Sequence, residues 1–211
     1  MEVIQQLIPK GHPNRPGIKL EALKAVVVHY TNNANPNMGA KNNIKWLSRA
    51  CKEIDGKRLE ADGKSTFNVA SAHIFCDEKE IVLAIPTDEV AWSCGDRNFS
   101  GDYQQIAYNV FGKRQNYQIV SVEICNNADW NKAANNAKEW IIDFIKSKGL
   151  QLDIIGSLHP QKKSNILGGE ILLLRHYDIT GKNCPAAFVK DIEAWKAFIQ
   201  DIADATKVRE V

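Results

Sequence analysis

A short segment near the C-terminal end of the chain, RHYDITGKNCP at residues 175–185, concentrates side chains that can do chemistry. It carries His176 and Cys184, and another histidine, His29, ends a run of valines far upstream. Two imidazole nitrogens and one thiolate form a suitable shell for zinc, and three protein ligands leave a fourth position for water. Because the sequence has no CxxC or HxxxH spacing, the pattern favours an open catalytic site over a closed structural one.

The residues alone leave a second interpretation of these side chains open. Taken singly, a histidine is more often a hydrogen-bonded polar residue than a metal ligand. A lone cysteine is more often a small buried apolar residue. The metal site is therefore a hypothesis that the fold has to support.

A carboxylate in the segment VSVEIC is a further candidate for chemistry. Side chains alternate along a strand, so Val122 and Ile124 share one face while Glu123 lies with Ser121 on the other. An ionised carboxylate on that face needs solvent, a cation or a metal ion nearby. A solvent-facing glutamate at the edge of a sheet is the alternative.

The elements that must position these residues alternate between strands and helices. Apolar and β-branched runs predict strands at 24–31, 67–77, 81–85 and 117–125, and helical spacing predicts helices at 40–54, 129–149 and 188–205. His29 and His176 both follow apolar runs, so they are expected where a sheet meets its loops. A turn at Asp77 and Glu78 predicts one antiparallel hairpin. The fold class is therefore α/β, with a central mixed β-sheet flanked by helices.

Composition sets limits on the class of protein. The 211 residues suit one domain spanning 1–211, with 185–211 as a closing C-terminal helical segment. A net charge of +2 gives no indication of nucleic-acid binding, and no apolar stretch reaches the roughly 20 residues that a membrane helix needs. Five scattered cysteines without a recognisable signal peptide indicate reduced thiols.

Five sequence blocks, in the order VVVHYT, SAHIF, EVAWSCGD, VSVEIC and RHYDITGKNCP, resemble a known enzyme family. They are similar to the zinc-dependent N-acetylmuramoyl-L-alanine amidases of type 2, which include phage endolysins, bacterial autolysins and the peptidoglycan recognition proteins. The likeness runs from about residue 10 to Pro185. It implies a peptidoglycan recognition protein-like amidase fold, with peptidoglycan as the partner. Many relatives append a wall-binding domain after the catalytic one, whereas in this sequence only the closing helix is expected after Pro185, and no separate wall-binding domain is seen.

The resemblance also implies roles for individual residues. His29, His176 and Cys184 match the ligands of a single Zn²⁺ ion. Glu123 matches the catalytic carboxylate, and Lys182 matches a lysine that faces the reacting carbonyl.

Some positions depart from the family pattern. Other relatives carry a tyrosine where this chain has Ala72, which shifts acid–base work toward Glu123, and often a histidine where it has Ser93. Asp178 is expected to hydrogen-bond within its turn or to orient a ligand. Residues expected to contact the substrate are Tyr30, Asn32, Asn33, Trp92 and Phe99, while His73 is expected to be structural or to face the substrate.

Two other functions remain open at this level. The first is a non-catalytic peptidoglycan-binding receptor of the same fold, although such receptors often lack the cysteine ligand. The second is a structural zinc site, which needs a fourth ligand such as Cys76 or Cys94. The absence of a recognisable signal predicts a protein that stays in the cytoplasm until it is released to the cell wall, with an extracellular location as the alternative.

Overall fold

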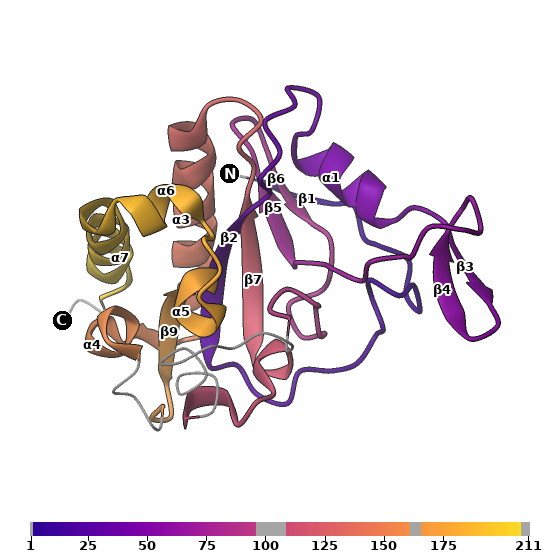
Figure 1. Cartoon of the computed structure of the whole chain (residues 1–211). Helices are drawn as coiled ribbons and strands as arrows, with labels where there is room; N and C mark the ends of the chain where they lie inside the picture. Colours follow the sequence, from indigo (N-terminus) through magenta and orange to yellow (C-terminus); the bar gives the residue numbers. More distant parts are fainter. Residues whose placement is uncertain (1, 96–108, 161–165, 208–211) are drawn as a thin grey trace.

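The computed structural model describes residues 2–95, 109–160 and 166–207. Within these described ranges, seven strands form one sheet in the order β1-β6-β5-β7-β2-β9-β8 (Figure 1). Neighbouring strands run parallel except for β5 and β6, which are antiparallel, so the predicted mixed sheet is confirmed. The strands are β1 (Val3–Gln5), β2 (Ala25–Tyr30), β5 (Ile74–Cys76), β6 (Ile81–Leu83), β7 (Ile119–Ile124), β8 (Gln151–Leu152) and β9 (Glu170–Arg175).

Two long helices, α3 (Trp130–Ser147) and α7 (Ile192–Thr206), cover one face of the sheet (Figure 1). Their apolar sides recur at helical spacing and pack on Val26 and Val28 of β2 and on Val122 of β7. The Asp129 carboxylate accepts a hydrogen bond from the Lys132 amide at 3.1 Å and caps α3, which stabilises a helix by about 1 kcal/mol. This layer fixes the central strands from behind.

The opposite face of the sheet is covered more lightly. It carries the short helices α1 (Ala40–Leu47) and α5 (His176–Thr180), together with connecting loops. Asp77, from the turn after β5, caps α1 at a distance by accepting a hydrogen bond from the Ala40 amide at 2.8 Å. Because this layer is thin, room remains on this face for a cleft.

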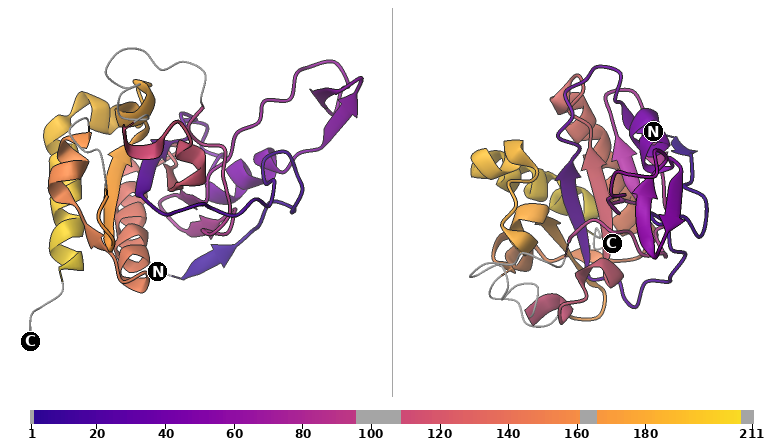
Figure 2. Two further views of the ribbon diagram at one scale, coloured as in Figure 1. Left: turned by 90° about the horizontal axis from the view of Figure 1, so that it is seen from below. Right: turned by 45° about the vertical axis from the view of Figure 1, so that its right-hand side comes forward.

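The helix predicted at 40–54 is wrong beyond Leu47. The chain leaves α1 there and forms a separate hairpin of β3 (Cys51–Ile54) and β4 (Lys57–Glu60), which stands away from the sheet (Figure 2). Asp55 and Gly56 join the two strands with φ values of 50° and 71°. An Asp-Gly pair with positive φ at both positions is the turn that two-residue hairpins prefer, and it overrides the weak helical spacing around it.

Three other predicted boundaries need correction. Of the strand predicted at 67–77 only β5 is a strand, and β6 ends at Leu83 rather than 85. The closing helix predicted at 188–205 is divided into α6 (Ala186–Lys190) and α7. Asp191 separates them because its carboxylate accepts a hydrogen bond from the Ala194 amide at 3.0 Å and starts a new helix.

The remaining described elements are short. They include the 3₁₀ helix η1 (Gln115–Tyr117) before β7 and the helix α4 (Ile154–Leu158) after β8. Within the described part of the chain, no helix combines the length and the apolar character needed to cross a lipid bilayer.

Candidate metal centre and cleft

Parallel pairing brings the functional side chains to one edge of the sheet. β2 pairs with β7 in a register that sets His29 beside Glu123. β2 also pairs with β9, with Val28 beside Arg175, so the residue after Arg175, His176, arrives next to His29. The carboxyl ends of neighbouring parallel strands are where α/β folds place their ligands.

The turn that follows α5 brings the chain back to this edge of the sheet. The left-handed Gly181, with φ of 77°, ends the helix, and the Tyr177 amide donates to the Cys184 carbonyl at 2.9 Å. Cys184 lies eight positions after His176 in the sequence, and the turn brings both side chains to the same place. Asp178 binds the backbone amide and the guanidinium of Arg175, so of its two expected roles the local one is observed.

His29, His176 and Cys184 form one buried cluster. One ligand atom from each lies within 4.8 Å of the others, and Cys184 Sγ is 3.9 Å from His29 Nδ1. Ligands bound at about 2.0–2.3 Å to one zinc ion lie roughly 3–4 Å from each other, close to these separations. His29 Nε2 and His176 Nδ1 are buried without a hydrogen-bond partner. A buried imidazole nitrogen with no partner is costly, and a cation in the cluster would remove that cost for the nitrogen that it binds.

The electrostatics of the cluster suit a cation. Burial, followed by the charges of His176, Lys182 and His73, lowers the pKa of His29 well below its usual value. Burial and Lys182 lower the pKa of His176 to about 3, so both rings are neutral near pH 7 and free to bind a metal. Burial and Glu123 raise the pKa of Cys184 to about 12. A bound metal ion would reverse that tendency, since a coordinating thiol loses its proton.

Glu123 lies beside the cluster but does not belong to it. Its Oε2 is buried with no hydrogen-bond partner, and burial raises its pKa to about 7, against the opposing charge of Lys182. As predicted, Val122 and Ile124 point into the core behind the sheet, while Ser121 and Glu123 occupy the other face. A carboxyl group that titrates near neutral pH can both accept and return a proton.

The cluster lies at the base of a cleft with two connected cavities. The first has a volume of about 500 Å³ and the second about 940 Å³. His176, Lys182 and Trp92 line both of them and therefore mark their junction. Of the predicted contacts, Tyr30 and Asn32 line the first cavity.

Of the two roles expected for His73, structural or facing the substrate, its contacts support the structural one. Its side chain is fully buried and lines neither cavity. Its Nδ1 accepts a hydrogen bond from the Ser121 amide at 2.9 Å, and its Nε2 donates to the Glu89 carbonyl at 2.8 Å. With both nitrogens engaged, and with burial lowering its pKa to about 4, it is a neutral core residue.

Other predicted positions are also placed by the structure. Among the described residues, no fourth His, Cys, Asp or Glu joins the cluster, which removes the basis for a closed site completed by Cys76 or Cys94. Cys125 packs in the core beneath α1. Asn33 is held by Asn126 and lines neither cavity, and Phe99 lies outside the described residues.

Sequence reasoning missed part of the first cavity wall. Trp46 and Asn43 of α1 line the cavity, together with Ser71. The helical spacing of α1 identifies its core positions but gives no indication that the intervening face borders a cleft. Ser93, at the position where relatives carry a histidine, lines both cavities and hydrogen-bonds to Ser121 at 2.5 Å.

Comparisons with known proteins place this chain in one enzyme family, the N-acetylmuramoyl-L-alanine amidases. The N-acetylmuramoyl-L-alanine amidase family profile matches residues 19–187. N-acetylmuramoyl-L-alanine amidase CwlL of Bacillus licheniformis is 29% identical over 194 residues, covering 90% of this chain and 44% of CwlL. N-acetylmuramoyl-L-alanine amidase BlyA of Bacillus subtilis (strain 168) is 31% identical over 196 residues, covering 90% of this chain and 44% of BlyA. The chain thus spans less than half the length of these relatives.

Solved structures share the fold. The catalytic domain of XlyA superposes with a TM-score of 0.61 and 24% identity, covering 94% of this chain and 99% of that one. PlyL superposes with a TM-score of 0.60 and 22% identity, covering 99% of this chain and 100% of the PlyL chain. The mixed sheet with its flanking helices is therefore the fold of these domains.

Proposed function

Because this chain belongs to the N-acetylmuramoyl-L-alanine amidase family, we propose that it is a peptidoglycan hydrolase. The bond cleaved is the amide between the lactyl group of N-acetylmuramic acid and the L-alanine of the stem peptide. The observation that carries the proposal is the buried cluster of His29, His176 and Cys184 with the unpartnered carboxylate of Glu123 beside it in a cleft. Residues 1–211 are proposed to form one catalytic domain.

One Zn²⁺ ion is the proposed cofactor, held by the imidazoles of His29 and His176 and by the thiolate of Cys184. When bound, zinc lowers the pKa of water from 15.7 toward about 7 and polarises a carbonyl oxygen, which an unactivated amide requires. The donor set of two neutral imidazoles and one sulfur is chemically suited to zinc, and it leaves an open position.

Glu123 is the proposed general base and acid. In the metal-free protein burial raises its pKa to about 7, and from its place beside the cluster its carboxylate can accept a proton from the attacking water and then deliver it to the departing alanine nitrogen. Lys182 lines both cavities at the junction, where its ammonium group can stabilise negative charge on the reacting carbonyl oxygen. Relatives that carry a tyrosine at the position of Ala72 have a hydroxyl there, whereas the methyl side chain of this alanine cannot share the acid–base work.

Tyr30, Asn32 and Trp92 are the proposed substrate contacts. All three line the first cavity, and Trp92 also lines the second. The ring of Trp92 packs edge-on against Tyr117 with centroids 5.9 Å apart, which fixes its orientation at the junction. A non-catalytic receptor of the same fold is the second candidate. The presence of Cys184 with Glu123 favours the enzyme over the receptor.

The decisive experiment incubates the zinc-loaded protein with purified cell walls. An amidase releases new L-alanine amino termini without new reducing sugar ends. A chelator should abolish the release, and added zinc should restore it. Glu123→Gln serves as the matched control, since it removes the base and keeps the side-chain shape. Binding to walls without new amino termini would instead support the receptor.

A further inference from the structure

Trp46 exposes an aromatic ring that the proposed mechanism does not use. Its side chain lies at the end of α1, lines the first cavity and is 52% exposed. Among the large apolar side chains that the described residues expose, it is the only aromatic one. A single exposed indole is common on a protein surface, but this one borders the cleft and is held there by a neighbouring cation.

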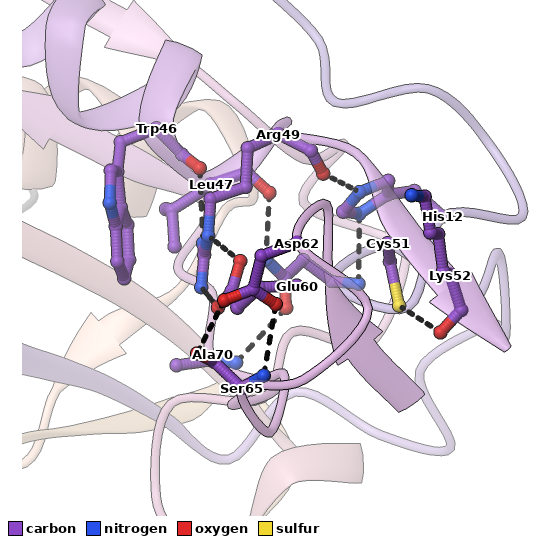
Figure 3. A network of polar contacts seen from close by, with 11 residues as sticks. His12, Trp46, Leu47, Arg49, Cys51, Lys52, Glu60, Asp62, Ser65 and Ala70 are labelled. Atoms are coloured by element: carbon purple, nitrogen blue, oxygen red, sulfur yellow. Dashed lines mark hydrogen bonds and ion pairs between the residues drawn. The ribbon is translucent and has the colours of Figure 1, made fainter. Parts of the chain in front are cut away.

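The indole is held in place from one side. The Arg49 guanidinium carbon lies 3.6 Å from the centroid of the Trp46 ring and 4.5 Å from that of Phe67, so the cation is sandwiched between two aromatic groups. Arg49 also donates to the Trp46 carbonyl at 3.0 Å. Figure 3 shows the guanidinium beside one face of the indole, with none of the labelled residues on the other face.

Arg49 itself is fixed by its surroundings. Two hydrogen bonds of 2.8 and 2.7 Å join it to the carboxylate of Glu60 in β4. Its carbonyl pairs with His12 Nε2 at 2.9 Å, and Asn14 ties the neighbouring Leu47 carbonyl to the same group of residues (Figure 3). The indole is therefore presented by a pre-formed support and needs little ordering when a ligand arrives.

Charge narrows the class of ligand. The positive charge of Arg49 is already matched by Glu60. Of the described residues that line the first cavity, one is a lysine or arginine, and it is Lys182 at the junction. In the described part of the chain, the Trp46 end of that cavity thus offers a flat aromatic face without an unmatched positive charge. A stem peptide is rich in carboxylates and has no flat apolar face. A sugar pyranose is uncharged and presents a face of polarised C–H groups, which the electron-rich face of an indole attracts.

We propose that Trp46 is a stacking platform for a pyranose ring of the peptidoglycan glycan, and that the first cavity holds the sugar side of the substrate. The described lining of the second cavity also has Lys182 as its single lysine or arginine, so charge does not distinguish the two cavities, and the stem peptide is assigned to the second one because Trp46 does not line it. The two cavities meet at His176 and Lys182, so a branched substrate can place its branch point at the metal cluster. This inference rests on the proposed function.

The test measures equilibrium binding of the two separated products by NMR titration of the zinc-loaded protein. One probe is the disaccharide of N-acetylglucosamine and N-acetylmuramic acid, and the other is the free stem tripeptide that begins with L-alanine. Trp46→Ala is expected to weaken disaccharide binding by about tenfold, a typical cost for losing one aromatic contact, and to change tripeptide binding by less than about twofold. Trp46→Phe should recover part of the disaccharide affinity.

Two controls separate stacking from indirect effects. Ile155→Ala removes an apolar side chain that is 77% exposed on α4, away from the cleft, and should leave both affinities unchanged. Arg49→Lys keeps the charge but loses the two-point contact with Glu60, and should weaken disaccharide binding less than Trp46→Ala does.

Several results would overturn the assignment. Unchanged disaccharide binding by Trp46→Ala, or a loss confined to the tripeptide, would reject a sugar platform even while the wild-type protein still cleaves walls. Failure of the wild-type protein to release L-alanine termini would reject the proposed function instead. Disaccharide binding that still depended on Trp46 in that case would support the platform on its own.

Discussion

Two polar regions of this molecule, the cluster at the end of the central strands and the network at the base of the β3–β4 hairpin, are built in opposite ways. In the cluster, His29 Nε2, His176 Nδ1 and Glu123 Oε2 are buried with no partner. At the hairpin base, Arg49, Glu60 and His12 all have close hydrogen-bond partners (Figure 3). Buried polar atoms normally find partners, so the unpaired set marks a place where something else is meant to bind. The paired set serves to hold a shape.

The largest expected effect comes from removing a ligand of the cluster. Cys184→Ala leaves two imidazoles, which are too few to hold zinc firmly, so we expect loss of both the metal and amide cleavage. Metal content by mass spectrometry and release of L-alanine termini measure the two losses. If the variant kept full zinc and full activity, the ligand assignment would be wrong.

The same variant also tests the comparison between the two regions. The Cys184 sulfur is buried, but its contact with His29 Nδ1 is long, at 3.9 Å, so Cys184→Ala should lower the unfolding temperature of the metal-free protein only slightly. A large loss of stability would show that the cluster holds the fold together. Thermal unfolding in the presence of a chelator, followed by circular dichroism, distinguishes these results.

Lys182→Ala should reduce the rate without removing the metal. Loss of one positioned group that stabilises a developing negative charge typically costs on the order of 10²- to 10³-fold in rate. Steady-state kinetics on a soluble muramoyl-peptide, with zinc content measured in parallel, would show a lower kcat at full occupancy. A variant that lost zinc in proportion to activity would place Lys182 in support of the ligands instead.

The stability of the fold as a function of pH tests Glu123, the carboxyl group among the unpartnered atoms of the cluster. In the metal-free protein, Glu123 keeps its proton up to a pKa of about 7, whereas in the unfolded chain it titrates near its ordinary value of 4.5. The unfolded state therefore binds fewer protons between these values, and this residue lowers the stability of the fold as pH rises through that window. Glu123→Gln removes the effect, so its advantage over wild type should grow to on the order of 3 kcal/mol by about pH 7.5.

Wild type must be compared with Glu123→Gln at each pH, because His29 and His176 change the stability of the fold with pH in the opposite direction from Glu123. Burial lowers the pKa of each below its usual value, so the unfolded state binds more protons and stability rises with pH over the lower part of the same range. Chemical denaturation of both proteins at several pH values isolates the Glu123 contribution, since the histidines are common to both. An advantage that stayed constant from about pH 4.5 to 7.5 would contradict the raised pKa.

The same contrast explains which features the sequence could predict. The central strands and α3 follow from β-branched runs and helical spacing, and the five ordered blocks carry the family resemblance. The register that sets His29 beside Glu123 depends on pairing between distant strands, and strand alternation alone gives the face but not the neighbour. The sequence could not decide between the two roles expected for His73, because its partners, the Ser121 amide and the Glu89 carbonyl, come from distant segments.

The hairpin was missed for a different reason. Its one local signal, Asp55-Gly56, lies within a stretch whose apolar residues also fit a helix, and the turn decides the outcome. The wall that carries Trp46 depends on this hairpin, because Glu60 of β4 holds Arg49 against the indole. Sequence spacing on α1 alone therefore could not predict an exposed aromatic group at the cleft.

The smallest expected effect is on the paired network. Hydrogen bonds from Arg49 lower the pKa of Glu60, so this pair stabilises the fold above pH 4.5 and the stabilisation is lost as pH falls through the folded pKa. Glu60→Gln should lower the unfolding temperature slightly at pH 7 and have no effect at pH 2. Metal content and the rate on a soluble muramoyl-peptide that lacks further sugars should change far less than in Lys182→Ala. Loss of zinc in Glu60→Gln would contradict the separation of the two regions, because a network whose polar groups are all paired has no bond to offer the cluster.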